Sequence, residues 1–197
     1  LTDLAAEPAE IESKQELVVN IPEATPIQDL SIKAGATLTL KGTDFDQIAC
    51  VKLEGATVDA ADFKSQSKTE ITLAVPEKAT DGTVYVVTKS GVEIPVGNII
   101  TVVPTELVAT PNPVKNGAEV TITGKDLDLV TGVAFPNGND TTVTLGSTIK
   151  AIVPITAQEK DADGNGIALS LANGKKVFVA YTLVQPTVAS CTPAAIT

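Results

Sequence analysis

The sequence predicts an all-β protein built as two tandem immunoglobulin-like β-sandwiches. One stretch occurs twice, because Gly35 to Leu53 aligns with Gly117 to Phe135 at an offset of 82 residues without a gap. Apolar and polar residues alternate along most segments, and this period of two residues is typical of a strand with one buried and one solvent-exposed face. Helical periodicity is not apparent, and about seven short strands per repeat fit a sandwich of this type.

The chain has 197 residues, which is enough for two domains at this period. We expect the first domain at 1–103, the second at 104–184, and the start of a third repeat or a C-terminal tail at 185–197. Val103 and Pro104 join the repeats without a Gly/Ser spacer that would behave as a flexible coil. The two domains are therefore expected to lie end to end with restricted bending.

The net charge and the absence of certain residue types exclude several classes of function. The net charge is -10 and every basic residue is lysine. This field repels phosphates and anionic headgroups, so we expect no nucleic acid partner. Direct membrane insertion is not expected either, since an apolar run of about 18 residues is lacking. Without histidine the chain lacks the usual general base and the Ser-His and Cys-His pairs, so we expect no enzyme activity.

The first strand is expected at Thr2 to Ile11, which resembles Thr105 to Val114 and likewise meets a proline that cannot continue a ladder. The first repeat then carries an insertion of about twenty residues, 12–32, ahead of Gly35. Within it, alternating apolar residues up to Ile21 predict an added edge strand.

The shared stretch predicts the strand that carries most of each core. Leu38 and Leu40, with Val120 and Ile122 in the second repeat, should face inward. The glycine that follows, Gly42 or Gly124, is expected to end the strand in a turn or bulge that needs positive φ. Further strands are predicted at 51–53, 70–75, 84–87 and 92–102, and at 133–135, 148–153, 167–171 and 176–183.

Two carboxylates flank one hydrophobic residue directly after each shared strand. They are Asp44 and Asp46 around Phe45, and Asp126 and Asp128 in the second repeat. Two interpretations stay open, a cation site and a capped turn with a buried hydrophobic plug.

The residues Asp161, Asp163 and Asn165 form the sharpest local motif. Together with Gly166 they reproduce positions 1, 3, 5 and 6 of a calcium loop, but position 12 is Ala172 instead of a glutamate. Calcium binding is one hypothesis and a polar hairpin turn is the other. We expect no other cofactor.

Two aromatic residues are candidates for ligand contact. Tyr85 and Phe178 lie out of phase with their apolar neighbours and should point outward, as ligand-contacting groups or as cover for the sheet. Phe45 and Phe135 are expected in the cores.

The run from Pro111 through Gly117-Ala-Glu-Val-Thr-Ile-Thr-Gly124 to Leu127 resembles the opening of an IPT/TIG domain of the E-set type, and Gly35 to Phe45 carries the same pattern. The resemblance covers nearly the whole chain and implies the immunoglobulin-like sandwich. Members occur in receptor ectodomains, Rel-type transcription factors, bacterial surface proteins and glycosidases. Because arginine-bearing loops are missing here, the DNA-binding branch does not apply.

The threonine-rich, lysine-only composition is most similar to tandem modules of outer-membrane-anchored proteins in Bacteroides-type bacteria. This resemblance implies a secreted, cell-surface or periplasmic protein, and a non-catalytic spacer or interaction segment that supports glycan capture or adhesion. The implied partners are further domains of the same chain, and a glycan or a surface protein. Alternatives are a direct carbohydrate-binding module and an ancillary domain of a polysaccharide-degrading enzyme.

Overall fold

The computed structural model describes residues 21–138 and 141–185. These residues form strands and three short 3-10 helices, η1 (Phe45–Gln47), η2 (Ala60–Asp62) and η3 (Leu127–Leu129), and contain no α-helix. The all-β fold class is confirmed. None of the helices in these ranges is long or apolar enough to cross a membrane.

The first unit, residues 21–103, is a β-sandwich. Its strands are β1 (Glu23–Ala24), β2 (Ile27–Ile32), β3 (Thr37–Thr43), β4 (Ile48–Leu53), β5 (Ala56–Asp59), β6 (Ser65–Gln66), β7 (Glu70–Ala74), β8 (Gly82–Thr88) and β9 (Glu93–Thr101). One sheet has the order β1-β3-β7-β6 and the other β2-β9-β8-β4-β5. Leu38, Leu40 and Phe45 are fully buried in the core of this unit.

The second unit, residues 104–185, repeats this arrangement with fewer strands. They are β10 (Thr105–Thr110), β11 (Glu119–Lys125), β12 (Val130–Ala134), β13 (Val143–Thr144), β14 (Ile149–Ile152), β15 (Ile167–Leu171) and β16 (Lys176–Val179). The sheets have the orders β10-β11-β14-β13 and β12-β15-β16. Val120 and Ile122 are fully buried, as the alternation predicts, and Phe135 packs edge-to-face on Tyr181 with ring centroids 5.7 Å apart.

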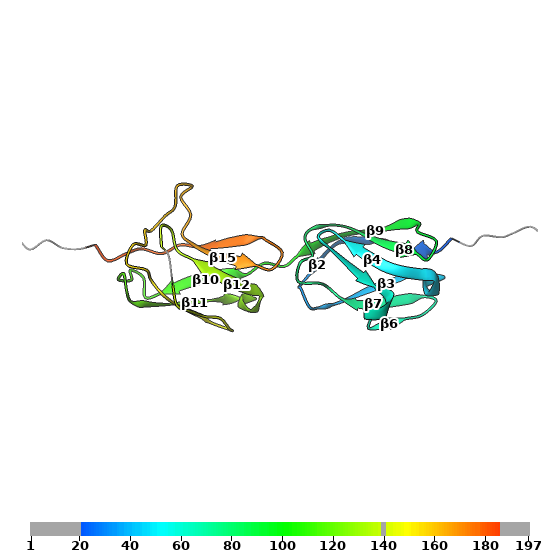
Figure 1. The fold of residues 1–197 in the computed structure, drawn as a ribbon, viewed down its shortest axis with the longest axis horizontal. Helices are drawn as coiled ribbons and strands as arrows, with labels where there is room; N and C mark the ends of the chain where they lie inside the picture. The colour runs from blue at the N-terminus through cyan, green and yellow to red at the C-terminus, as the bar shows by residue number, and fades with distance from the viewer. Residues whose placement is uncertain (1–20, 139–140, 186–197) are drawn as a thin grey trace, which may run out of the picture.

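The two units have separate interiors. One hydrophobic cluster draws all its residues from positions 24–99 and the other from 107–183. Each sheet likewise takes its strands from one side of Pro104. Figure 1 shows two lobes end to end, with β1 and the last described residues at opposite ends of the molecule.

The start of the first unit corrects the expected alignment. The predicted strand at 2–11 lies outside the described residues, as does most of the predicted edge strand before Ile21. Glu23 pairs with Thr43 as Thr105 pairs with Lys125, and both pairs keep the 82-residue offset. The counterpart of β10 is therefore the β1 region. Among the described residues, 22–32 match 104–114 and so are not part of the insertion predicted at 12–32.

The next segment repeats in the same register. Strand β2 runs parallel to β9 and pairs Ile32 with Thr101, while Val114 pairs in parallel with Leu183. Ile32 and Val114 are both buried and again lie 82 residues apart. The sequence does not reveal that β1 matches β10, because the two-residue strand β1 is too short to show alternation. Its register is set by backbone hydrogen bonds.

Gly42 has a different role from the one expected. It lies inside β3 and lacks a positive φ, and the positive φ belongs to Asp44, at 52°. A Cβ on Gly42 would lie 2.2 Å from the ring of Phe45. The glycine is needed because the Phe45 ring packs directly against the backbone.

Candidate functional site

The candidate site is the junction between the two units. Only 102–104 separate β9 from β10. The Val102 N–H donates a hydrogen bond to the Ile32 carbonyl at 3.0 Å, and Pro104 is buried. The connection is therefore held against the first unit and does not behave as a free linker.

A lysine from the first unit bridges two aspartates of the second. Lys33 Nζ lies 2.6 Å from Asp126 Oδ1 and 2.8 Å from Asp128 Oδ1. Asp126 adopts left-handed backbone angles, φ 57° and ψ 30°, and the buried Leu127 anchors the segment between the two acids. The hydrogen bonds to Asp126 and Asp128 raise the pKa of Lys33, and the one from Lys33 lowers the pKa of Asp128.

The structure distinguishes between the two interpretations of the paired aspartates, a cation site and a capped turn with a buried hydrophobic plug. Neither Asp44 nor Asp126 makes a side-chain cap to its short helix, so the capped-turn hypothesis is wrong for the side chains. The buried plug is confirmed, since Phe45 and Leu127 are both buried. In the second unit the partner of the acids is a lysine ammonium from the neighbouring unit.

A second bridge forms across the junction. Lys175 Nζ lies 2.7 Å from Asp81 Oδ2, while Asp81 Oδ1 accepts hydrogen bonds from the backbone N–H and the hydroxyl of Thr101 at 2.7 and 2.8 Å. Asn173 Nδ2 donates to the Ala79 carbonyl at 3.1 Å. The pKa of Asp81 falls to about 2, first because of Lys175 and then because of Thr101.

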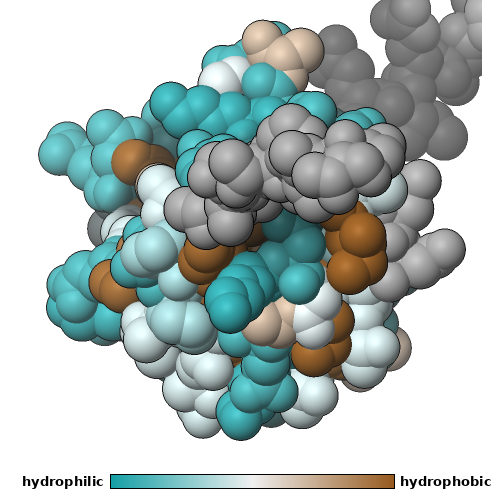
Figure 2. Space-filling model, turned by 90° about the vertical axis from the view of Figure 1, so that its left-hand side faces the viewer, coloured by the Kyte–Doolittle hydropathy of each residue, from teal (hydrophilic) through white to brown (hydrophobic). Residues whose placement is uncertain are grey.

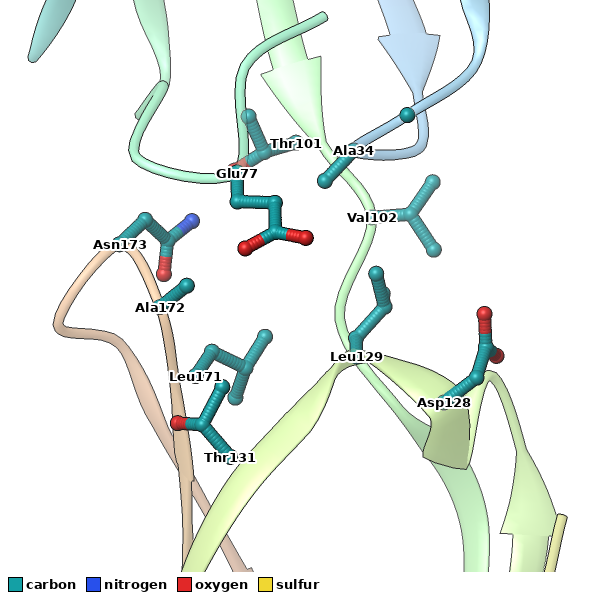
Figure 3. Close-up of a pocket in the computed structure, with 11 residues that line it drawn as sticks. Ala34, Glu77, Thr101, Val102, Asp128, Leu129, Thr131, Leu171, Ala172 and Asn173 are labelled. Atoms are coloured by element: carbon teal, nitrogen blue, oxygen red, sulfur yellow. The ribbon is translucent and has the colours of Figure 1, made fainter. Parts of the chain in front are cut away.

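A small cavity of about 150 Å³ lies between these bridges. Figure 3 shows Glu77 from the first unit and Asn173 from the second pointing toward it, with Leu129 below. Its lining residues are Ala34, Gly35, Glu77, Thr101, Val102, Asp128, Leu129, Thr131, Leu171, Ala172 and Asn173. Ligand pockets usually measure roughly 300–1,000 Å³, so the geometry is that of a docked interface.

The structure does not bring Tyr85 and Phe178 together. Tyr85 lies half-buried on β8 between two fully buried valines, so its side chain faces outward as expected. Phe178 on β16 is 44% exposed and faces Ala168 across the strand pair. They belong to sheets of different units, and neither has an aromatic cross-strand partner. A role in ligand contact stays a prediction.

The Asp161 segment is a hydrogen-bonded turn. Asp161 Oδ1 accepts from the N–H groups of Asp163 at 2.9 Å and Asn165 at 2.8 Å. These contacts, with Asn165 first, lower the pKa of Asp161. The carboxylate of Glu159, two residues earlier, accepts a hydrogen bond from the Leu183 N–H at 2.7 Å. No group of three acidic, cysteine or histidine residues in the described ranges is arranged for a metal, and calcium binding stays a hypothesis.

A wider groove lies along β12 in the second unit. Thr131, Gly132, Val133 and Leu145 are among the residues that line it. In the first unit the equivalent strand β4 is covered by β5, whereas β12 pairs only with β15 among the described strands. The groove therefore follows an open sheet edge, and none of its lining residues is aromatic.

Sequence reasoning missed the bridging lysines. A usable signal was present, because Lys33 and Lys115 keep the same 82-residue offset as the paired aspartates. Lys175 and Asp81 had no such signal, because the strand register aligns them with Val92 and Gly164, which carry no charge.

No family model matches the sequence, and no curated protein matches it. Similar solved structures include the surface glycan-binding protein PbSGBP-B from Prevotella bryantii, 19% identical over 83% of this chain and 42% of that chain, with a TM-score of 0.38.

Another is SGBP-B of the Bacteroides ovatus mixed-linkage glucan utilization locus in complex with a mixed-linkage heptasaccharide, with 12% identity, coverage of 78% and 43%, and a TM-score of 0.33. The titin domains z1z2 in complex with telethonin are 14% identical over 86% of this chain and 100% of that chain, with a TM-score of 0.30. The chain thus spans less than half the length of the two glycan-binding proteins. At these identities and TM-scores the comparisons assign the chain neither a family nor a function.

Proposed function

We propose that this chain is a non-catalytic spacer in a bacterial cell-surface protein, built from tandem modules of the IPT/TIG type. Its task is to hold neighbouring domains of the same protein at a set distance and orientation, in support of glycan capture or adhesion. The surface location and the family rest on the sequence resemblance. The spacer role rests on the junction.

The observation that carries the proposal is the pair of ion bridges at the junction. Lys33 and Lys175 bridge the units in opposite directions, one from each side, and the connection between the units is three residues long. Exposed ion pairs contribute roughly 0.2–1 kcal/mol each. Two bridges plus the Asn173 hydrogen bond give about 1–2 kcal/mol in total, which is about a tenfold preference for the docked orientation.

Spin-label distance measurements test the proposal. Lys41 and Thr123 are exposed, lie at equivalent positions of β3 and β11, and are suitable for labelling as Lys41→Cys and Thr123→Cys after replacement of Cys50 and Cys191 by alanine. We expect one narrow distance distribution. It should broaden when Lys33→Ala and Lys175→Ala are combined, because both bridges are then lost.

Lys52→Ala is the matched control. Lys52 pairs with Glu93 on the surface of the first unit, away from the junction, so this change removes an exposed ion pair of the same kind without touching the bridges. A broad distribution in the parent chain, or equal broadening by the control, would contradict the spacer role.

Affinity electrophoresis separates the spacer from a direct carbohydrate-binding module. The chain should migrate identically in gels with and without mixed-linkage glucan. Retardation that disappears with Phe178→Ala would favour direct glycan binding and would give this exposed aromatic residue the role predicted for it.

A further inference from the structure

The lysine turn and the paired aspartates of the junction recur at the two outer ends of the described residues. Lys115 occupies the same turn as Lys33, because the Ala36 N–H donates to the Lys33 carbonyl and the Ala118 N–H to the Lys115 carbonyl, both at 3.1 Å. The glycine two residues after each lysine has the same left-handed φ, 79° and 81°. The second unit therefore carries at its outer end the same lysine turn that the first unit uses to bridge the two aspartates.

The opposite end of the first unit carries the matching acids. Asp44 has φ 52° and ψ 33°, close to the values of Asp126, and the following 3-10 helix also buries one large hydrophobic residue. None of the ion pairs in the described ranges involves Asp44, Asp46 or Lys115. One end thus presents an acidic pair and the other a lysine, both in the geometry that is bridged at the junction.

Apolar side chains accompany these charges at both ends. Ile155, the counterpart of Glu77 in the junction cavity, is 77% exposed, and Val184, the counterpart of Val102, is 40% exposed. Figure 2 looks onto this end of the second unit, where hydrophobic residues lie among hydrophilic ones. A large exposed isoleucine at the position that faces a neighbour in the junction is typical of a surface that another unit covers.

The first unit has the complementary half-cavity at its free end. An open cavity of about 310 Å³ is lined by Ile21, Pro22, Gln47, Thr88, Lys89, Ser90 and Val92. Four of these residues, Gln47, Thr88, Lys89 and Ser90, are the counterparts of Leu129, Leu171, Ala172 and Asn173 in the junction cavity. Ile21 is 60% exposed and Val92 is 46% exposed.

We propose that the two free ends are the complementary halves of the same junction and that each takes another copy of this 82-residue repeat. The spacing of the connecting prolines agrees, since Pro22, Pro104 and Pro186 are separated by 82 residues each. The inference rests on the proposed spacer function and extends it from one junction to a repeating one.

The geometry has a defined consequence for assembly. The interface joins unlike surfaces, head to tail, so it does not close on itself as a two-fold interface does. Each further repeat adds the same rotation and translation. Lys115 then bridges the counterparts of Asp44 and Asp46 in the unit that follows.

A double-length chain tests the repeating junction. Residues 1–185 are followed directly by residues 22–197, so that Pro22 of the second copy takes the place of Pro186. Labels at Thr123 of the first copy and Lys41 of the second report on the new junction, and they occupy the same positions as the labels on the natural junction. We expect the two distance distributions to share the same mean. The new one should be as wide as that of the single chain carrying Lys175→Ala, because the Lys175 bridge has no counterpart at the new junction.

Charge reversal identifies the bridge. Lys115→Glu in the first copy should broaden the new distribution several-fold and leave the Lys41 to Thr123 distance in the single chain unchanged. A new junction with a different mean distance, or one much wider than that of the single chain carrying Lys175→Ala, would overturn this inference and leave the spacer function intact. A broad natural junction would instead contradict the spacer function itself.

Discussion

Replacing Asp81 by asparagine tests how much the junction charge stabilises the first unit. Asparagine keeps the acceptor oxygen for both groups of Thr101 but removes the charge opposite Lys175. The experiment thus separates the ion bridge from the hydrogen bonds that fix the end of β9.

The magnitude follows from the lowered pKa. A fall from 3.8 to about 2 corresponds to about 2.4 kcal/mol at neutral pH for a group shielded from water, and the hydrogen bonds from Thr101, which asparagine can still accept, supply part of it. The Asp81 side chain is 47% exposed, so solvent screening reduces this to about 1 kcal/mol. Because the folded pKa is depressed, the stabilisation is present above pH 3.8 and is lost as the pH falls through about 2.

Urea unfolding followed by tyrosine fluorescence measures the effect. The chain has two tyrosines and no tryptophan, so Tyr85 reports on the first unit alone in a Tyr181→Phe background. We expect Asp81→Asn to lower the free energy of unfolding by about 1 kcal/mol at pH 7 and by much less near pH 2. Asp62→Asn, an exposed change in the same unit, is the control. A loss at pH 7 that persists undiminished at pH 2 would refute the charge-based reasoning.

Three further predictions concern single side chains. Gly42→Ala should destabilise the first unit by roughly 1–3 kcal/mol in urea unfolding, because its Cβ would overlap the Phe45 ring; a neutral result would contradict the packing role. Burial raises the pKa of Tyr181 to about 12, so the stability of the second unit should fall as the pH rises from about 10 to 12. Tyr181→Phe should flatten this profile. At pH 7 the same change should cost about 1 kcal/mol of stability, because the hydrogen bond to the Gln158 carbonyl is lost. Asp161→Ala should lower the melting temperature equally with and without millimolar calcium, whereas a calcium-dependent rise in the parent chain would favour the calcium loop.

The strands with strong alternation could be predicted from the sequence. Leu38 and Leu40 alternate with threonines, and both are fully buried on β3. The segment 167–171 is β15 with the predicted bounds. These elements follow from burial of one face, which a local pattern records directly.

The short strands could not be predicted in the same way. β1 and β6 have two residues each, and their pairing depends on backbone register and not on side-chain type. The last strand of the second unit ends at Val179, four residues before the predicted end.

The junction was beyond local reasoning for a different reason. Lys33 and Asp126 are 93 residues apart, and either looks like an ordinary surface charge when taken alone. They can be identified only by comparing the two repeats, because the lysine and the pair of aspartates each occur twice at a spacing of 82 residues.

The parallel pairing of β2 with β9 has a mechanical consequence. These strands lie near the beginning and at the end of the first unit, so tension along the molecule pulls them past each other and loads their hydrogen bonds together instead of one at a time. In the second unit the matching contact is the single bridge between Val114 and Leu183. A stretched molecule should therefore extend first in its second unit, and the first should hold to higher force.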